Sequence, residues 1–161
     1  MRLGARRVDM PEDHYFTPRG RLLAFITVFH RGLYRWSGGR LGTASRGKPT
    51  LLLTTTGRKS GQAHTVPLPY LPLPESSRMV VVASFAGNPK HPAWYLNADA
   101  NPEVTVQYGR RKFAAVASTA SGDERADLWK RVVNDSPWYA DYQAQTTRQI
   151  PLVILTPAPL R

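Results

Sequence analysis

A run of strand-forming residues, followed by a short turn between two glycines, constrains this chain more than any other feature. Residues 51–56 read Leu-Leu-Leu-Thr-Thr-Thr, and a second apolar run begins at Thr65. Gly57 and Gly61 bracket the residues between the two runs. Apolar and β-branched residues favour strands, and glycine adopts positive φ without steric cost. We therefore expect two strands joined by a tight turn.

The residues inside this turn include two positively charged side chains. Arg58, Lys59 and Ser60 place two adjacent cations beside a hydroxyl group. Free backbone N–H groups, a guanidinium and an ammonium that converge at one tip form a good anion site, above all for phosphate. The alternative is a solvated hairpin tip whose charges only keep the protein soluble. Spacing alone does not decide between the two interpretations, because short motifs match by chance.

Composition limits the class of protein. A chain of 161 residues that is 42% apolar, with four Trp, seven Tyr and five Phe, is a single globular domain with a substantial core. The absence of Cys excludes disulfides, thiolate catalysis and Cys-based zinc sites. Residues 1–48 hold ten Arg/Lys and three Asp/Glu, so they contribute +7 of the net charge of +11. This asymmetry points to an anionic partner, whether membrane lipid, nucleic acid or a phosphorylated cofactor.

The first part of the chain divides into two segments. We expect residues 1–20 to form a flexible basic arm, and residues 21–161 to form one domain. Residues 21–38 predict an amphipathic helix, since one face collects the apolar side chains of Leu22, Ile26, Phe29, Leu33 and Trp36. We favour packing of this helix on its own domain over the alternative, binding to an anionic membrane. No apolar run reaches the roughly 20 residues that span a bilayer. We expect a cytoplasmic protein, peripheral on the inner face of the membrane if the helix binds lipid.

The remaining residues predict short strands with helices inserted between them. We expect strands near 51–56, 63–71, 79–85, 103–108, 111–119 and 152–156. Helices are predicted over 92–100 and from a capping box at 121–124 to about 133. A third helix is predicted to open at Ser136-Pro137, with Ser136 as the N-cap and Pro137 at the first helical position. The prolines within 67–74 require an edge strand or a loop. This pattern is typical of a mainly β (α+β) fold, a small β-barrel with helical insertions.

Two further stretches are candidates for chemistry. The segment 84–97 follows an apolar strand and passes Gly87 into a predicted helix, a natural place for an anion or a planar ring. Tyr139 and Tyr142 are three residues apart, so both phenols project from one helix face. They could bind a carbonyl or nitro oxygen and supply a proton, or simply pack inward. The four His residues share no metal-ligand spacing, so a bound cofactor must supply any redox chemistry.

Three stretches taken together resemble a known family. They contain Thr-Thr-Thr-Gly-Arg-Lys-Ser-Gly-Gln at 54–62, Ala-Trp-Tyr-Leu-Asn at 93–97 with Ala-Asn-Pro at 100–102, and Asp-Tyr-Gln at 141–143 with Ile-Pro at 150–151. As an ordered set they are similar to the mycobacterial deazaflavin-dependent nitroreductase and its relatives, which are quinone reductases with a split, FMN-binding-like β-barrel. The resemblance implies that reduced coenzyme F420, an 8-hydroxy-5-deazaflavin with a phosphate and an oligoglutamate tail, binds here.

The resemblance also implies roles for individual residues. The phosphate and acidic tail would be held by Arg58, Lys59, Ser60 and Gly61. The rest of the cofactor would be cradled by His64, Thr65, Val66, Pro67, Leu68, Pro69, Val82, Ala83, Ser84, Phe85, Ala93, Trp94, Tyr95, Leu96 and Asn97. The acceptor, a quinone or a nitro compound, would be faced by Ser84 and Tyr139, with Tyr142 beside them.

Departures from the family pattern lie at the acceptor end of the predicted site. Ser136 stands where the nitroreductase has a tyrosine, Pro69 stands where it has another, and Trp138 replaces a small serine. From the family to this chain, cofactor binding is therefore expected to carry over better than the reduction of nitro-compound prodrugs. The rival interpretation is a non-enzymatic basic module that binds anionic membrane or nucleic acid. No nucleic-acid motif supports it, and the aromatic residues are not interleaved with cations as in a stacking platform.

Overall fold

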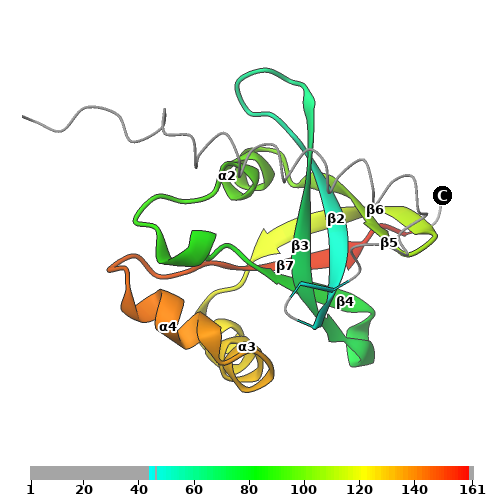
Figure 1. Cartoon of the computed structure of the whole chain (residues 1–161). Helices are drawn as coiled ribbons and strands as arrows, with labels where there is room; N and C mark the ends of the chain where they lie inside the picture. Colours follow the sequence, from blue (N-terminus) through cyan, green and yellow to red (C-terminus); the bar gives the residue numbers. More distant parts are fainter. Residues whose placement is uncertain (1–43, 46, 160–161) are drawn as a thin grey trace, which may run out of the picture.

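The computed structural model describes residues 44–45 and 47–159 (Figure 1). The predicted arm 1–20 and amphipathic helix 21–38 lie outside the described residues. The strands are β1 (Ala44–Ser45), β2 (Lys48–Thr56), β3 (Ala63–Leu73), β4 (Arg78–Val82), β5 (Glu103–Tyr108), β6 (Arg111–Thr119) and β7 (Leu152–Pro157). The helices are α2 (Ala93–Ala100), α3 (Gly122–Asp135) and α4 (Trp138–Ala144), with 3-10 turns η2 (Pro74–Ser76) and η3 (Phe85–Gly87).

The strands form a closed antiparallel barrel. Their order is β1-β2-β3-β4-β7-β6-β5, and β2 also pairs with β5, which closes the sheet on itself. Thr54, for example, pairs with Thr65 on β3 and with Thr105 on β5. The β5–β6 hairpin turns through Gly109 and Arg110, between the two predicted strands. The predicted barrel with helical insertions is therefore confirmed.

Two cores lie on opposite faces of the barrel wall. On β4, Met79 and Val81 point into the barrel, whereas Val80 points outward against α3 and α4. On β7, Val153 and Leu155 face inward in the same way, with Leu152 and Ile154 facing outward. These two strands are therefore buried on both faces, which explains their continuous apolar sequences. Helix α2 packs on β2 and β6, away from α3 and α4 (Figure 1).

Strand β3 changes its partner midway. Residues 63–69 pair with β2 alone, and residues 70–73 pair with β4 alone. Successive N–H groups of a strand point to alternate sides, and proline has no N–H to donate. Pro67 and Pro69 are odd-numbered and Pro72 is even-numbered, so their backbone nitrogens point to opposite sides of β3. Each proline therefore points its nitrogen away from the strand with which its part of β3 pairs. The proline-rich stretch is thus an extended strand with one neighbour at every point, as an edge strand requires.

Three local predictions need correction. The Ser121 side chain makes no capping hydrogen bond, so the predicted capping box does not form, and Glu124 binds Arg78 instead. Pro137, not Ser136, is the N-cap residue of α4, and the Ser136 hydroxyl donates to Asp135 Oδ2 at 2.8 Å. Strand β4 ends at Val82 rather than at residue 85, since the chain turns there into η3.

Candidate functional site

The candidate site is a cavity in the seam where β3 and β4 stop pairing. Its volume is about 510 Å³, and none of the lining residues is charged. Beyond the last pair, Tyr70 with Val81, the two strands diverge and leave Pro69 and Val82 on opposite walls. The lining residues come from β3, the end of β4, η3, α2 and α4, and they are Val66, Leu68, Pro69, Val82, Ser84, Phe85, Ala86, Pro92, Ala93, Trp94, Trp138, Tyr139 and Tyr142.

Helix α4 supplies an aromatic wall. Tyr139 is buried, with 7% of its surface exposed, and its ring centroid lies 6.1 Å from that of Tyr142 and 5.8 Å from that of Trp138. The two tyrosines therefore share one helix face and line the same cavity, as their spacing predicts. Phenol hydroxyls at an apolar wall can donate a hydrogen bond to an oxygen of a bound molecule.

The loop after β4 forms a second wall, in contact with α4, and has an unusual backbone. Phe85 and Ala86 both have positive φ, +47° and +51°, a conformation that is costly for residues with a Cβ. The Phe85 side chain is half exposed beside the cavity. Such a loop persists only when its surroundings hold it in place.

Arg148 holds this loop from beneath. Its guanidinium donates to the backbone oxygens of Ala83, Ser84 and Asn88, at 3.2, 2.7 and 2.8 Å respectively. His91 Nδ1 lies 3.4 Å from Arg148 Nη1. Burial and the Arg148 charge both lower the pKa of His91, against the opposing effect of Asp99. Arg148 therefore fixes the loop that carries Ser84 by several charge-assisted hydrogen bonds.

The turn at 57–62 lies beside this cavity, because it is joined to β3 and to α2. Asn97 Oδ1, on buried Asn97 of α2, accepts from the Arg58 backbone N–H at 3.2 Å and from Arg58 Nη1 at 3.1 Å. Ser60 Oγ lies 3.4 Å from His64 Nε2. A Cβ on Gly57 would lie 2.5 Å from Ser60 Oγ, so the side chains of Ser60 and His64 pack directly against the glycine backbone.

The expected set of free N–H groups at this turn is only partly correct. The Gly57 and Gly61 N–H groups donate to Gln62 O and Gly57 O, and the Gln62 N–H donates to Ser60 Oγ. Together with the Arg58 N–H, four backbone donors are therefore engaged within the turn and with α2. An anion at this turn would therefore meet mainly the exposed side chains of Arg58 and Lys59.

The predicted site residues fall into two groups. Ten line the cavity: Val66, Leu68, Pro69, Val82, Ser84, Phe85, Ala93, Trp94, Tyr139 and Tyr142. The others lie outside it, at the turn or on the far side of the same elements: Arg58, Lys59, Ser60, Gly61, His64, Thr65, Pro67, Ala83, Tyr95, Leu96 and Asn97. Thr65 bonds to Thr54 across β2 and β3 at 2.8 Å. Tyr95 lines a smaller cavity of about 130 Å³ between α2 and β6.

Sequence reasoning missed several contributors. Ala86 and Pro92 line the cavity but were assigned no role in it, although each neighbours a predicted residue in the chain, whereas Trp138 lines the acceptor end where the departures from the family pattern were expected. Arg148 was missed altogether, because a single arginine in a loop carries no motif. Within the part of the chain that the structure describes, no cluster of three His, Asp or Glu could hold a metal ion.

The uncharged cavity and the cationic turn at 57–62 together fit a planar cofactor with an anionic tail. An uncharged slot between aromatic side chains and a sheet suits a tricyclic ring, and the adjoining cationic turn suits phosphate and carboxylate groups. The residues on β3 and α2 link the two parts, since each element contributes to both. The geometry is therefore compatible with the cofactor that the resemblance implies.

Comparison with known proteins gives a consistent result. The profile of the F420H(2)-dependent quinone reductase family matches residues 28–157. An F420H(2)-dependent quinone reductase of Mycobacterium tuberculosis (strain ATCC 25618 / H37Rv) is 38% identical over 131 residues, which cover 79% of this chain and 87% of that protein. The solved structure of the F420-H2 dependent reductase FDR-A matches with a TM-score of 0.61 at 44% identity, covering 66% of this chain and 93% of that chain.

A further solved structure, described as a domain-swapped dimer, has a TM-score of 0.64 and 36% identity, and covers 86% of this chain and 99% of its own. The family profile spans well over half of the chain, and the sequence relative covers more than two thirds of it. These matches extend over the barrel, the turn at 57–62 and the tyrosine-bearing helix. The chain belongs to the F420H2-dependent quinone reductase family.

Proposed function

We propose that the protein catalyses hydride transfer from reduced coenzyme F420 to a quinone. The observation that carries the proposal is the uncharged aromatic cavity next to the Arg58–Lys59 turn, in a chain whose family depends on F420H2. The deazaflavin supplies the hydride when it is bound. The protein contributes binding, orientation and electrostatics, which is what its side chains offer.

The proposed binding roles divide along the cavity. Arg58 and Lys59 hold the phosphate and the acidic tail, with Arg58 positioned by Asn97. Val66 and Leu68 on β3 and Trp94 on α2 enclose the ring and exclude water from one end of the cavity. A dry, pre-shaped slot strengthens every polar contact made inside it.

The proposed acceptor pocket is formed by Ser84, Tyr139 and Tyr142. Tyr139 is the most buried of these phenols and lines the cavity from α4, so we assign it the proton donor role at the acceptor oxygen. An oxygen that gains negative charge is stabilised by a donor aimed at it. Tyr142 shapes the pocket beside Tyr139, their ring centroids being 6.1 Å apart.

Quinones are the preferred acceptors in this proposal, and nitro compounds are the second class. Ser136 does not line the cavity but a neighbouring narrow cleft, and its hydroxyl is engaged with Asp135. Trp138 and Pro69 occupy the cavity wall at the acceptor end. A bulky indole and a rigid ring there restrict the space for a prodrug more than for a flat quinone.

Two measurements test the proposal. Fluorescence titration should show binding of F420 much tighter than binding of flavin mononucleotide, and quinone-dependent oxidation of F420H2 should be measurable in steady state. Replacing both Arg58 and Lys59 by Ala should weaken F420 binding by about tenfold or more, because charge-assisted contacts contribute about 1.5–3 kcal/mol each. Lys130→Ala together with Arg131→Ala removes equal charge from the exposed surface of α3 and serves as the control. Equal affinity for both cofactors, or parental affinity in the folded Arg58/Lys59 variant, would contradict the proposal.

We also propose a peripheral contact with anionic membrane, through the apolar and basic pattern of residues 21–38. Within residues 44–159 no helix is long and apolar enough to cross a membrane. Sedimentation with vesicles containing 30 mol% phosphatidylglycerol should show binding at low salt that weakens as salt is added. Absence of vesicle binding at low salt would contradict this proposal and favour packing of the predicted helix on its own domain.

A further inference from the structure

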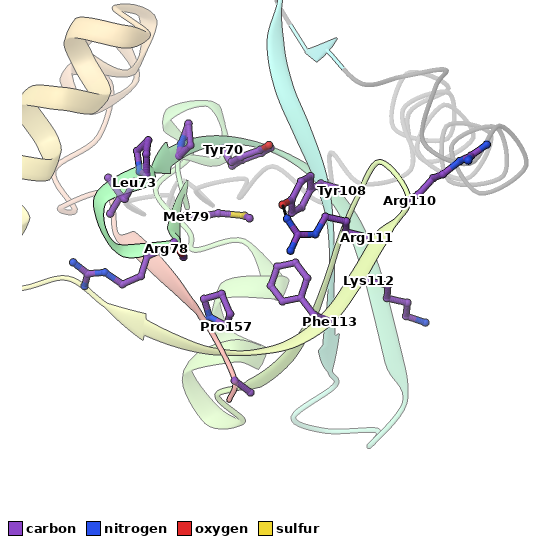
Figure 2. Close-up of a pocket in the computed structure, with 14 residues that line it drawn as sticks. Tyr70, Leu73, Arg78, Met79, Tyr108, Arg110, Arg111, Lys112, Phe113 and Pro157 are labelled. Carbon is purple, nitrogen blue, oxygen red and sulfur yellow. Dashed lines mark hydrogen bonds between the residues drawn. The ribbon is translucent and has the colours of Figure 1, made fainter. Parts of the chain in front are cut away.

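A second and larger cavity opens at the other end of the barrel. It has a volume of about 750 Å³ and is lined by the ends of β3, β5 and β7 and by the starts of β4 and β6 (Figure 2). The turn at 57–62 joins the opposite ends of β2 and β3, so this cavity is remote from the cationic turn of the proposed cofactor site. The two cavities share no lining residue.

The floor of this cavity is apolar and aromatic. The ring of Tyr108 lies 6.1 Å from Tyr70 on one side and 6.1 Å from Phe113 on the other, measured between ring centroids. Met79 and Leu73 complete the floor from the neighbouring strands. A concave surface of this size with aromatic walls is typical of a binding site for a small organic molecule.

The rim of the cavity is cationic. Arg111 Nη1 donates to the Tyr108 hydroxyl at 3.0 Å, and the Arg111 guanidinium carbon lies 5.7 Å from the centre of the Tyr108 ring. Figure 2 shows Arg111 extending over the cavity toward Tyr108, whereas Arg78, Arg110 and Lys112 point outward around it. The hydrogen bond and the ring fix the orientation of Arg111, which lowers the entropic cost of binding an anion.

Negative charge is missing from this lining. All four charged residues among those that line the cavity are Arg or Lys. The carboxylates of two adjacent segments are already paired, Glu75 with Arg131 at 2.7 Å and Glu124 with Arg78 at 3.1 Å. Arg110, Arg111 and Lys112, three consecutive cations of the β5–β6 hairpin, therefore set the sign of the local potential.

We propose that this cavity binds a small amphiphilic anion, with a carboxylate or phosphate on Arg111 and an apolar chain or ring on Tyr70, Tyr108, Phe113 and Met79. The guanidinium fork matches both head groups in geometry and charge. The apolar floor contributes through burial of the ligand's hydrocarbon, which distinguishes this site from a general attraction of anions to a basic surface.

The experiment uses the full-length chain and the methyl resonance of Met79. The protein has three Met residues, and Met79 lies in this cavity, so its 13C-labelled methyl signal reports occupancy once Met79→Leu has assigned it. Octanoate and octyl phosphate, both monomeric at millimolar concentration, should shift this signal saturably. Octanol has the same chain and no charge, so we expect it to bind about tenfold more weakly or worse. The tighter of the two anions identifies the preferred head group.

Matched variants locate the site. Arg111→Met should weaken octanoate binding about tenfold, whereas Lys130→Met, which removes equal charge from the exposed surface of α3, should change it less than twofold. Tyr108→Phe removes the hydroxyl that accepts from Arg111 and keeps the ring, so it should weaken octanoate binding less than Arg111→Met does. This second variant keeps the test valid if Arg111→Met misfolds. The indole N–H signals of Trp94 and Trp138 should stay unchanged, since both line the other cavity.

Three outcomes would overturn the proposal. They are an unperturbed Met79 methyl signal at saturating octanoate, equal binding of octanol and octanoate, and movement of the Trp94 and Trp138 signals in place of the Met79 signal. None of them depends on quinone reduction, so failure here leaves the proposed enzymatic function untouched.

Discussion

Asn97 and Arg58 are 39 positions apart in sequence, yet one amide oxygen of Asn97 accepts both the backbone N–H and the guanidinium of Arg58. This pair ties the cationic turn to α2, the helix whose first residues line the candidate cavity. The buried amide therefore acts as a positioning group for a surface arginine. Asn97 was predicted to contact the cofactor, and in the structure its amide oxygen contacts Arg58, the residue proposed to hold the cofactor's phosphate.

This relationship predicts a specific result for Asn97→Ala. Arg58 loses its orientation but keeps its charge, so F420 affinity should fall about three- to tenfold, a loss of about 0.7–1.4 kcal/mol. Asn101→Ala, at the end of the same helix, is the control. In an Arg58→Ala background, Asn97→Ala should have little further effect on affinity. Additive losses in this double-mutant cycle would show that Asn97 acts on the cofactor independently of Arg58.

Tyr139→Phe tests the proton donor. Removing the hydroxyl retains the ring and its packing, so turnover with a quinone should fall about 100-fold while F420 affinity stays within about twofold. Tyr142→Phe should reduce turnover by less than tenfold, because its role is to shape the pocket. Turnover and cofactor affinity of each variant, measured against one quinone, separate the two roles. Parental turnover in Tyr139→Phe would mean that water delivers the proton.

Arg148→Met tests the support beneath the cavity wall. Three backbone oxygens, of Ala83, Ser84 and Asn88, lose a charged donor, so the free energy of unfolding should fall by about 2–4 kcal/mol. The loop should also loosen, which lowers turnover more than it changes quinone KM. Arg148→Lys should restore only part of both effects, because one ammonium cannot replace the planar fork. Unchanged stability and turnover would exclude this role.

Gly87→Ala tests the contact between η3 and α4. Gly87 has φ +77°, and an added Cβ would lie 2.9 Å from the backbone oxygen of Tyr142. Backbone cannot move aside as a flexible side chain can, so we expect a loss of about 2–4 kcal/mol in stability. Gly109→Ala is a matched control with φ +55° and open space around it, for which about 1 kcal/mol is expected. Equal losses in chemical denaturation would contradict the steric argument.

The pair formed by Asp135 and Lys48 predicts a pH dependence. Burial tends to raise the pKa of Asp135, but hydrogen bonds from Ser136 and Lys48 together with the Lys48 charge hold it below its usual 3.8. The unfolded chain therefore binds a proton first as the pH falls. The stabilisation is present above about pH 4 and is lost as the pH drops through the folded-state pKa. Asp135→Asn should flatten the stability curve below about pH 4, and an unchanged curve would exclude the pair as a source.

Local sequence patterns predicted the barrel strands well. Strands β5 and β6 begin and end where predicted, because alternating apolar residues and a Gly-Arg turn are strong local signals. The two-residue strand β1 was not predicted, since it is too short to show a pattern. The capping box at Ser121 failed because Glu124 finds a tertiary partner in Arg78. Tertiary contacts thus overrode a local signal whose energy is small.

The site was predictable where family motifs exist and not elsewhere. The turn at 57–62 and the tyrosines of α4 are local motifs, and both adjoin or line the site as expected. Arg148 and the second cavity were not predictable, because their partners come from segments far apart in the chain. Arg111, for example, faces residues that extend from Tyr70 to Ala158. Only the barrel topology brings these segments together.

The prolines of β3 affect the section of the barrel wall in which β3 does not pair with β4. An unpaired strand edge is a template on which another chain can add, and a missing donor at alternate positions interrupts that template. Pro67 and Pro69 place such interruptions along the open section, beside the cavity. The missing donors at Pro67 and Pro69 therefore disfavour pairing of this section with β4 and with the edge strand of a second copy. On the β3 side the binding slot is kept open by this lack of hydrogen-bond donors, whereas on the other side Arg148 holds the loop that follows β4.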